Sequence, residues 1–179
     1  MATLGTLLAP DLMTPGSCWQ LHMAVNGYSG PTGLSLTTQA FRGRGFRILD
    51  QREQRLRVEL LEDGYRCWLD KEVVIGTAEQ RGPWHPTLLA EAEIARRIPA
   101  VLAWSERAEE KPNTYLWGGT TEPDMDCSGL MQLAFASQDI WIPRDAYQQE
   151  RFCQPVAVAP GDNDCENCIP LTGGREIIT

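Results

Sequence analysis

Three consecutive residues, Asp126-Cys127-Ser128, carry the side chains best suited to chemistry, and Gly129 follows them. Apolar residues follow Cys127 at helical spacing, which predicts a helix whose first turn holds the thiol. Asp126 is then a natural N-cap for this helix. Because the positive end of a helix dipole favours the thiolate, Cys127 can act as the nucleophile of covalent catalysis. A buried structural cysteine is the alternative interpretation.

A nucleophilic thiol of this kind needs a histidine to accept its proton. The sequence contains 2 histidines, His22 and His85, and both lie before its midpoint. We expect His22 in a strand and His85 in a linker, so either would need a rearranged site to reach Cys127. Surface or barrel-packing roles are therefore expected for both, and the general-base histidine is absent.

Residues 18–78 contain short runs typical of strands, separated by turn residues such as Asn26-Gly27 and Asp63-Gly64. Leu56, Val58 and Leu60 alternate along one run and should share one face. The strands expected here cover Trp19–Val25, Leu34–Thr38, Gly45–Leu49, Leu56–Leu61 and Tyr65–Leu69. Such closely spaced strands predict a small SH3-like barrel, a fold that more often binds than catalyses.

Residues 1–17 have no sustained periodicity and predict a loosely ordered lead-in without a function. Residues 79–87 contain two X-Pro breakers and predict a linker. Helical spacing begins at Leu88, and Pro99 should close one helix and open a second, which ends near Glu110.

The composition of the chain excludes some classes of function. The chain has 179 residues and a formal net charge of -8, which argues against nucleic acid as a partner. Its apolar runs are far shorter than the ~20 residues of a membrane span. No Lys or Arg precedes Arg42, so a secretory signal is not expected and the predicted location is cytoplasmic. In that compartment the 6 cysteines should be thiols.

Three segments together resemble the NlpC family of bacterial cell-wall cysteine peptidases. They are Tyr115–Gly119, Asp126–Leu130 and Trp141–Gln149. The similarity is closest to cyanobacterial members, which place a bacterial SH3-like barrel before a papain-like catalytic domain. It extends from about Cys18 to Gly161.

The resemblance implies cleavage between γ-D-glutamate and the L-diamino acid diaminopimelate in peptidoglycan stem peptides. Fragments with a free N-terminal L-alanine are preferred by the cyanobacterial members. By the same resemblance Cys127 is the nucleophile, while Asp126 and Ser128 help to hold the terminal ammonium of the substrate, for which a carboxylate and a hydroxyl are suitable.

The resemblance also implies roles for two tyrosines. Tyr65 corresponds to a barrel residue that reaches the site and restricts it to short, free-ended peptides, although an aromatic residue after a barrel turn more often serves packing. Tyr115 corresponds to a residue near the thiol and the oxyanion region. Arg144 and Asp145 match a motif that shapes the groove, without a firm role for either.

The sequence departs from the family pattern after the cysteine helix. Family members take the general base and its orienting partner, usually two histidines, from downstream strands, whereas no histidine follows His85. Gln154–Val156 and Pro160–Asp162 still resemble the family, but the next residues form no apolar strand. We therefore expect 88–162 to be the N-terminal part of a peptidase domain and 163–179 a divergent tail, as in a truncated or frame-shifted enzyme.

The tail contains the pair Cys165 and Cys168. Two cysteines make only half a zinc site, and Cys153 is the only nearby addition. A thioredoxin-like role would need a βαβ context that is missing. The sequence therefore predicts no metal and no cofactor.

The predicted fold class is α+β, an SH3-like barrel followed by an incomplete papain-like domain. The predicted function is hydrolysis of peptidoglycan stem peptides, impaired by the missing histidines. One alternative is a non-catalytic module that binds muropeptides or a protein partner through the surface of Tyr65 and Asp126. Another is a helical half that does not fold stably alone.

Overall fold

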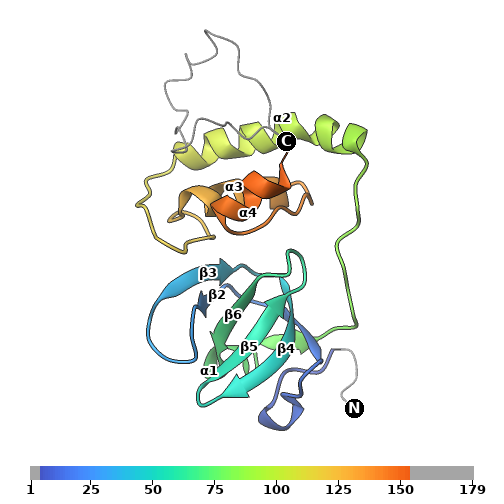
Figure 1. The fold of residues 1–179 in the computed structure, drawn as a ribbon, viewed down its shortest axis with the longest axis vertical. Helices are drawn as coiled ribbons and strands as arrows, with labels where there is room; N and C mark the ends of the chain where they lie inside the picture. Colours follow the sequence, from blue (N-terminus) through green and yellow to red (C-terminus); the bar gives the residue numbers. More distant parts are fainter. Residues whose placement is uncertain (1–4, 154–179) are drawn as a thin grey trace.

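The structure is a computed structural model that describes residues 5–153, in which a curled β-sheet lies beside a layer of helices (Figure 1). The fold class is therefore α+β, as predicted. The predictions for Gln154–Val156, Pro160–Asp162 and the 163–179 tail with Cys165 and Cys168 lie outside the described residues.

Within 5–153, one antiparallel sheet of 7 strands has the order β3-β2-β6-β5-β4-β1-β7. The strands are β1 (Cys18–Leu21), β2 (Val25–Tyr28), β3 (Leu36–Ala40), β4 (Gly45–Arg52), β5 (Arg55–Leu60), β6 (Arg66–Asp70) and β7 (Ala78–Gln80). Leu56, Val58 and Leu60 are fully buried on one face of β5, as their alternation predicts. They pack with Trp19, Phe46 and other residues in the core of the barrel.

The predicted loosely ordered lead-in is wrong for residues 5–17. A short 3-10 helix, η1 (Pro10–Leu12), lies here, and the side chains of Leu8 and Met13 on either side of it enter the barrel core. The Leu8 backbone N–H also donates to the Ala78 carbonyl at 2.7 Å. Scattered apolar residues carry no period that a sequence pattern could detect, yet they cover one opening of the barrel.

Two predicted strand boundaries are also corrected. The expected strand Trp19–Val25 is divided into β1 and β2, because β1 pairs with β4 and β7 whereas β2 pairs with β3 and β6. The predicted linker begins too early, because β7 continues to Gln80 and pairs with β1. Residues 81–90 contain neither helix nor strand.

Three helices follow this connection: α2 (Glu91–Glu109), α3 (Cys127–Ala136) and α4 (Ala146–Phe152). A four-residue helix, α1 (Lys71–Val74), belongs to the barrel. The predicted break at Pro99 is wrong, because α2 continues through it. A proline inside a helix removes one hydrogen bond, but Ile98 and Val101 on either side of it pack into the same helical core. No helix within 5–153 is long and apolar enough to cross a membrane.

Arg44 is at the centre of one set of contacts between the barrel and the helices. Its buried guanidinium lies 2.7 Å from Asp63 Oδ1 and faces the rings of Phe41 and Trp141, whose centroids are 5.6 and 5.2 Å away. The two rings stack at 5.9 Å. Asp63 Oδ2 accepts a 2.7 Å hydrogen bond from Gln132 of α3. The hydrogen bond thus connects the barrel to α3 (Cys127–Ala136), and the charge and ring contacts connect it to Trp141 beyond α3.

Replacing Leu8 by alanine tests the role of the first segment. Because Leu8 is 1% exposed within the barrel core, Leu8→Ala should lower the free energy of unfolding by about 2–5 kcal/mol. The neighbouring Leu7 is 51% exposed, so Leu7→Ala is the matched control and should change it by less than about 0.5 kcal/mol. Chemical denaturation measures both, and equal effects of the two substitutions would contradict the packing described.

Candidate active site around Cys127

Cys127 is the first residue of α3 and carries a half-buried, free thiol. Asp126 is the N-cap, and its Oδ1 accepts the Gly129 N–H at 2.7 Å. The predicted helix start and cap are thus confirmed. The thiol therefore lies at the N-terminal end of the helix.

Asp126 is also half of a buried ion pair. Arg144 donates from Nη1 to Oδ1 at 3.0 Å and from Nη2 to Oδ2 at 2.8 Å, a two-pronged contact. Oδ2 accepts a further bond from the Gly118 N–H at 2.9 Å. Burial opposes the charge of Asp126, but the Arg144 guanidinium and the backbone N–H groups outweigh it and hold the pKa of this carboxyl below its usual range.

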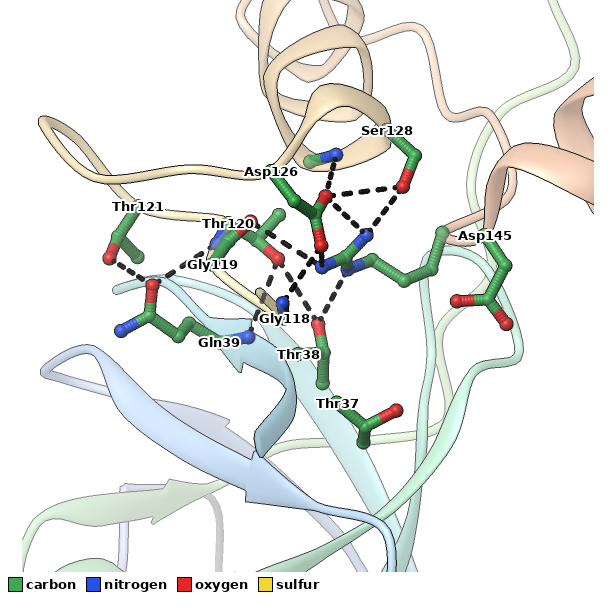
Figure 2. Close-up of polar contacts among 12 residues, drawn as sticks. Thr37, Thr38, Gln39, Gly118, Gly119, Thr120, Thr121, Asp126, Ser128 and Asp145 are labelled. Carbon is green, nitrogen blue, oxygen red and sulfur yellow. Dashed lines mark hydrogen bonds and ion pairs between the residues drawn. The ribbon is translucent and has the colours of Figure 1, made fainter. Parts of the chain in front are cut away.

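Arg144 extends this pair across the interface between barrel and helices. It is 2% exposed. Its Nη1 donates to Ser128 Oγ at 2.9 Å, and its Nε donates to Thr38 Oγ1 of β3 at 3.3 Å. Figure 2 shows Thr38 on the barrel side facing Asp126 and Ser128 on the helix side. Arg144 therefore connects a barrel strand to the first turn of α3.

The loop before α3 makes a second set of contacts with β3 (Figure 2). Gln39 Oε1 accepts hydrogen bonds from the Thr120 N–H at 3.1 Å and from Thr121 Oγ1 at 2.8 Å. The hydroxyls of Thr38 and Thr120 lie 3.3 Å apart. Side chains of the barrel thus hold the segment that leads to the thiol.

Close packing explains two glycines in the recognised motifs. Gly118 has a φ of +82°, and a side chain there would meet the Leu36 carbonyl of the barrel at 2.7 Å. A side chain on Gly129 would collide with the Gly119 carbonyl oxygen. The glycines allow the loop, α3 and β3 to approach closely enough for the Asp126 hydrogen bonds to form.

Tyr65 reaches the helical layer from the end of the barrel, next to this network. Its hydroxyl lies 2.7 Å from Thr37 Oγ1 and donates to Asp145 Oδ1 at 3.2 Å. Burial raises the pKa of Tyr65 to about 12, so the phenol stays neutral at physiological pH. Burial, with repulsion from Asp126, also raises the pKa of Asp145, although Tyr65 and Arg144 act in the opposite direction.

Tyr115 lies on the solvent side of the thiol. It is 64% exposed, and Trp117 two residues later is 76% exposed. The partial burial of Tyr115 raises its pKa, and repulsion from Cys127 and Asp126 raises it further. Tyr115 therefore lies close to the thiol, and an exposed aromatic surface adjoins Cys127.

Both histidines lie on the surface of the molecule. His22 Nε2 is 2.7 Å from Glu79 Oε2, with the His22 side chain 46% exposed. His85 is exposed in the connection before α2. The expected surface roles are confirmed, but the predicted strand position of His22 is wrong, because His22 lies in the bend between β1 and β2.

Two family models match the sequence. Residues 27–73 match the bacterial dipeptidyl-peptidase Sh3 domain, and residues 112–165 match the NlpC/P60 family. The first match falls on the curled sheet, and the second contains Tyr115, Cys127 and Arg144. The second match makes residues 112–165 similar to part of the NlpC/P60 family, whose members are in general cysteine peptidases that act on peptidoglycan. No curated protein matches the chain.

Solved structures of NlpC proteins show distant similarity. NlpC2 from Trichomonas vaginalis has a TM-score of 0.40 and 14% identity, over 81% of this chain and 75% of that one. NlpC1 from the same organism has a TM-score of 0.29 and 21% identity, over 80% and 47% of the two chains. An NlpC/P60 family protein from Bacillus cereus ATCC 10987 has a TM-score of 0.31 and 20% identity, over 79% and 43%. This chain thus spans less than half of the latter two proteins.

The sequence did not reveal the barrel residues that hold the site. Thr37, Thr38 and Gln39 contact Tyr65, Arg144 and the Thr120 segment respectively. In the sequence they form an ordinary strand of β-branched and polar residues, and no local pattern distinguishes them. The resemblance did include Arg144, but only the structure connects it to Asp126.

Adding a methyl group to Gly129 tests the packing around the cap. Gly129→Ala should force the Gly119 loop away from α3 and lower the free energy of unfolding by about 1–3 kcal/mol. The matched control is Gly82→Ala, because a side chain at Gly82 would meet nothing within 4 Å. That control should be neutral or stabilising by up to about 1 kcal/mol. Differential scanning calorimetry measures the stability of both variants. An unchanged stability of Gly129→Ala would disprove the close contact.

Proposed function

We propose that this protein is a cysteine endopeptidase for peptidoglycan stem peptides, cleaving between γ-D-glutamate and diaminopimelate as the cyanobacterial members of the resembled family do. The observation that supports this most directly is the half-buried free thiol of Cys127 at the start of α3, within a segment that matches the NlpC/P60 family.

The proposed reaction proceeds in two steps. The Cys127 thiolate attacks the γ-glutamyl carbonyl carbon, the C–N bond breaks, and the diaminopimelate amine leaves with a proton while a thioester forms. Water then hydrolyses the thioester and regenerates the thiol. Both steps need a group that accepts and returns protons, a role that a histidine performs in enzymes of this kind. Since no histidine follows His85, we propose that these 179 residues turn over slowly.

Recognition of a free N-terminal ammonium is part of this proposal. Asp126 and Ser128 are the expected partners, but the structure engages both Asp126 oxygens with protein donors, including Arg144. An ammonium group would have to share them. Asp145, which is only partly buried and accepts from Tyr65, supplies a second carboxylate beside the same network. Tyr115 would border the bound peptide.

A second candidate function is binding without catalysis. The exposed side chain of Tyr115 near the thiol favours it, since exposed aromatic residues are common at binding surfaces. A module of this kind would hold stem peptides or another protein whether or not Cys127 reacts.

Turnover of a defined tripeptide tests the proposed reaction. The chain should release diaminopimelate from L-Ala-γ-D-Glu-diaminopimelate about 10²–10⁴-fold more slowly than an enzyme with a general base. Added imidazole should accelerate release by supplying that base. Cys127→Ala should abolish release, whereas Cys153→Ala, which removes another half-buried thiol, should not. Mass spectrometry quantifies the product.

The controls separate the two candidate functions. Release that persists in Cys127→Ala would refute the peptidase. If imidazole left the rate of release unchanged, the missing base would not be what limits that rate. Calorimetric binding of the tripeptide to Cys127→Ala, with no release by the unmodified chain in imidazole, would favour the binding module instead.

Removing the Tyr65 hydroxyl tests the contribution of the barrel to recognition. Because this phenol orients Asp145, which is proposed to help hold the substrate ammonium, Tyr65→Phe should leave that carboxylate less well placed and weaken binding of the tripeptide by about tenfold. Calorimetry in the Cys127→Ala background measures the effect. Tyr28→Phe is the matched control, since the Tyr28 ring faces Arg55 at 3.7 Å elsewhere in the barrel. Equal losses in both variants would exclude a specific role for Tyr65.

A further inference from the structure

The N-cap of α3 creates an electrostatic conflict at Cys127. A carboxylate is among the best N-caps, and Asp126 fulfils this role through the Gly129 N–H. The same carboxylate is adjacent in sequence to the thiol, and a nearby negative charge disfavours the thiolate. An aspartate cap therefore stabilises the helix start while opposing the ionisation that a nucleophile needs.

Arg144 removes this conflict through its geometry. Its two terminal nitrogens contact the two Asp126 oxygens at 3.0 and 2.8 Å. Asp126 is 8% exposed and Arg144 2% exposed, so water screens the pair little. A close pair of opposite charges has a far weaker field at a neighbouring atom than the carboxylate alone.

We propose that Arg144 is a positioning and charge-balancing residue for Cys127: by pairing with Asp126, it cancels the negative charge of the N-cap, so that the cap can hold α3 without opposing the thiolate. The proposal rests on the proposed function in one respect only, that Cys127 is the nucleophile. Arg144 acts through Asp126 and does not touch the substrate.

The surrounding charged groups agree with this role. Among the described residues 5–153, Tyr115 interacts with the thiol and is neutral below its raised pKa. Asp145 and Tyr65 lie on the other side of Arg144 and supply a carboxyl and a neutral phenol. Within this group Arg144 supplies the positive charge.

The barrel fixes the orientation of the guanidinium. Thr38 of β3 accepts from Nε at 3.3 Å, while Ser128 accepts from Nη1 at 2.9 Å and the Gly119 carbonyl from Nη2 at 3.4 Å. These acceptors are uncharged, so they orient Arg144 without competing for its charge. The barrel thereby influences the reactivity of a thiol in the helical layer.

The pH dependence of Cys127 alkylation tests the proposal. The chain is treated with iodoacetamide across a pH series, and peptide mapping by mass spectrometry follows Cys127 separately from the other cysteines. Arg144→Gln should raise the midpoint by about one pH unit, because the Asp126 charge is then unbalanced. Asp126→Asn should lower it by about one unit, because asparagine is an equally good cap without the charge. The double variant should return to the original midpoint.

Two comparison variants keep the test decisive. Arg144→Lys retains the charge and should keep the original midpoint. Gln149→Leu removes buried hydrogen bonds to the Ser128 and Pro143 carbonyls at 3.0 and 2.8 Å without changing charge, so it should also leave the midpoint in place. If Arg144→Gln does not fold, Asp126→Asn and the double variant still carry the test.

The opposite signs of the single variants distinguish charge balance from a merely structural role, in which both substitutions would move the midpoint in the same direction. Shifts of the same sign, or no shift in Asp126→Asn, would overturn the proposal. The measurement requires no peptide hydrolysis, so the proposed peptidase can fail while the charge balance is upheld, and the reverse.

Discussion

The ion pair between Asp126 and Arg144 is the contact on which the rest of the site depends. Asp126 begins α3, binds the glycine loop through Gly118, and in turn holds Arg144. A buried charge is tolerated only with its partner in place, and loss of one member leaves an uncompensated charge. The loop, the start of α3 and the segment before α4 are therefore mutually dependent for electrostatic reasons.

The barrel is a structural part of this site and not an appended module. Its β3 strand contributes Thr38 to the ion pair, and Asp63, beyond β5, accepts from Gln132 in the middle of α3. The first contact fixes the N-terminus of the helix and the second fixes its rotation about its axis. Arg44, which faces two aromatic rings and Asp63, adds buried charged groups to the interface between the two parts.

Local patterns predicted the parts of the molecule that local physics determines. The α+β class, most strands of the barrel and the start of α3 with its Asp126 cap could be predicted, because alternation and capping are encoded by neighbouring residues. The partner of Asp126, the barrel residues that hold Arg144, and the burial of Leu8 could not, because those contacts join residues far apart in sequence. The break predicted at Pro99 was wrong for a related reason, because long-range packing of α2 outweighed one lost backbone hydrogen bond.

The wide sequence separation across the interface has a consequence for how the molecule is made. The residues joined by the Arg144–Thr38 and Gln132–Asp63 hydrogen bonds are 106 and 69 positions apart. During synthesis the N-terminal barrel is completed at Gln80, before the residues of the thiol helix have been added, and domains generally fold in that order. The barrel residues that contact the helical layer, Thr38 and Asp63, are therefore synthesised before the segment that carries Cys127.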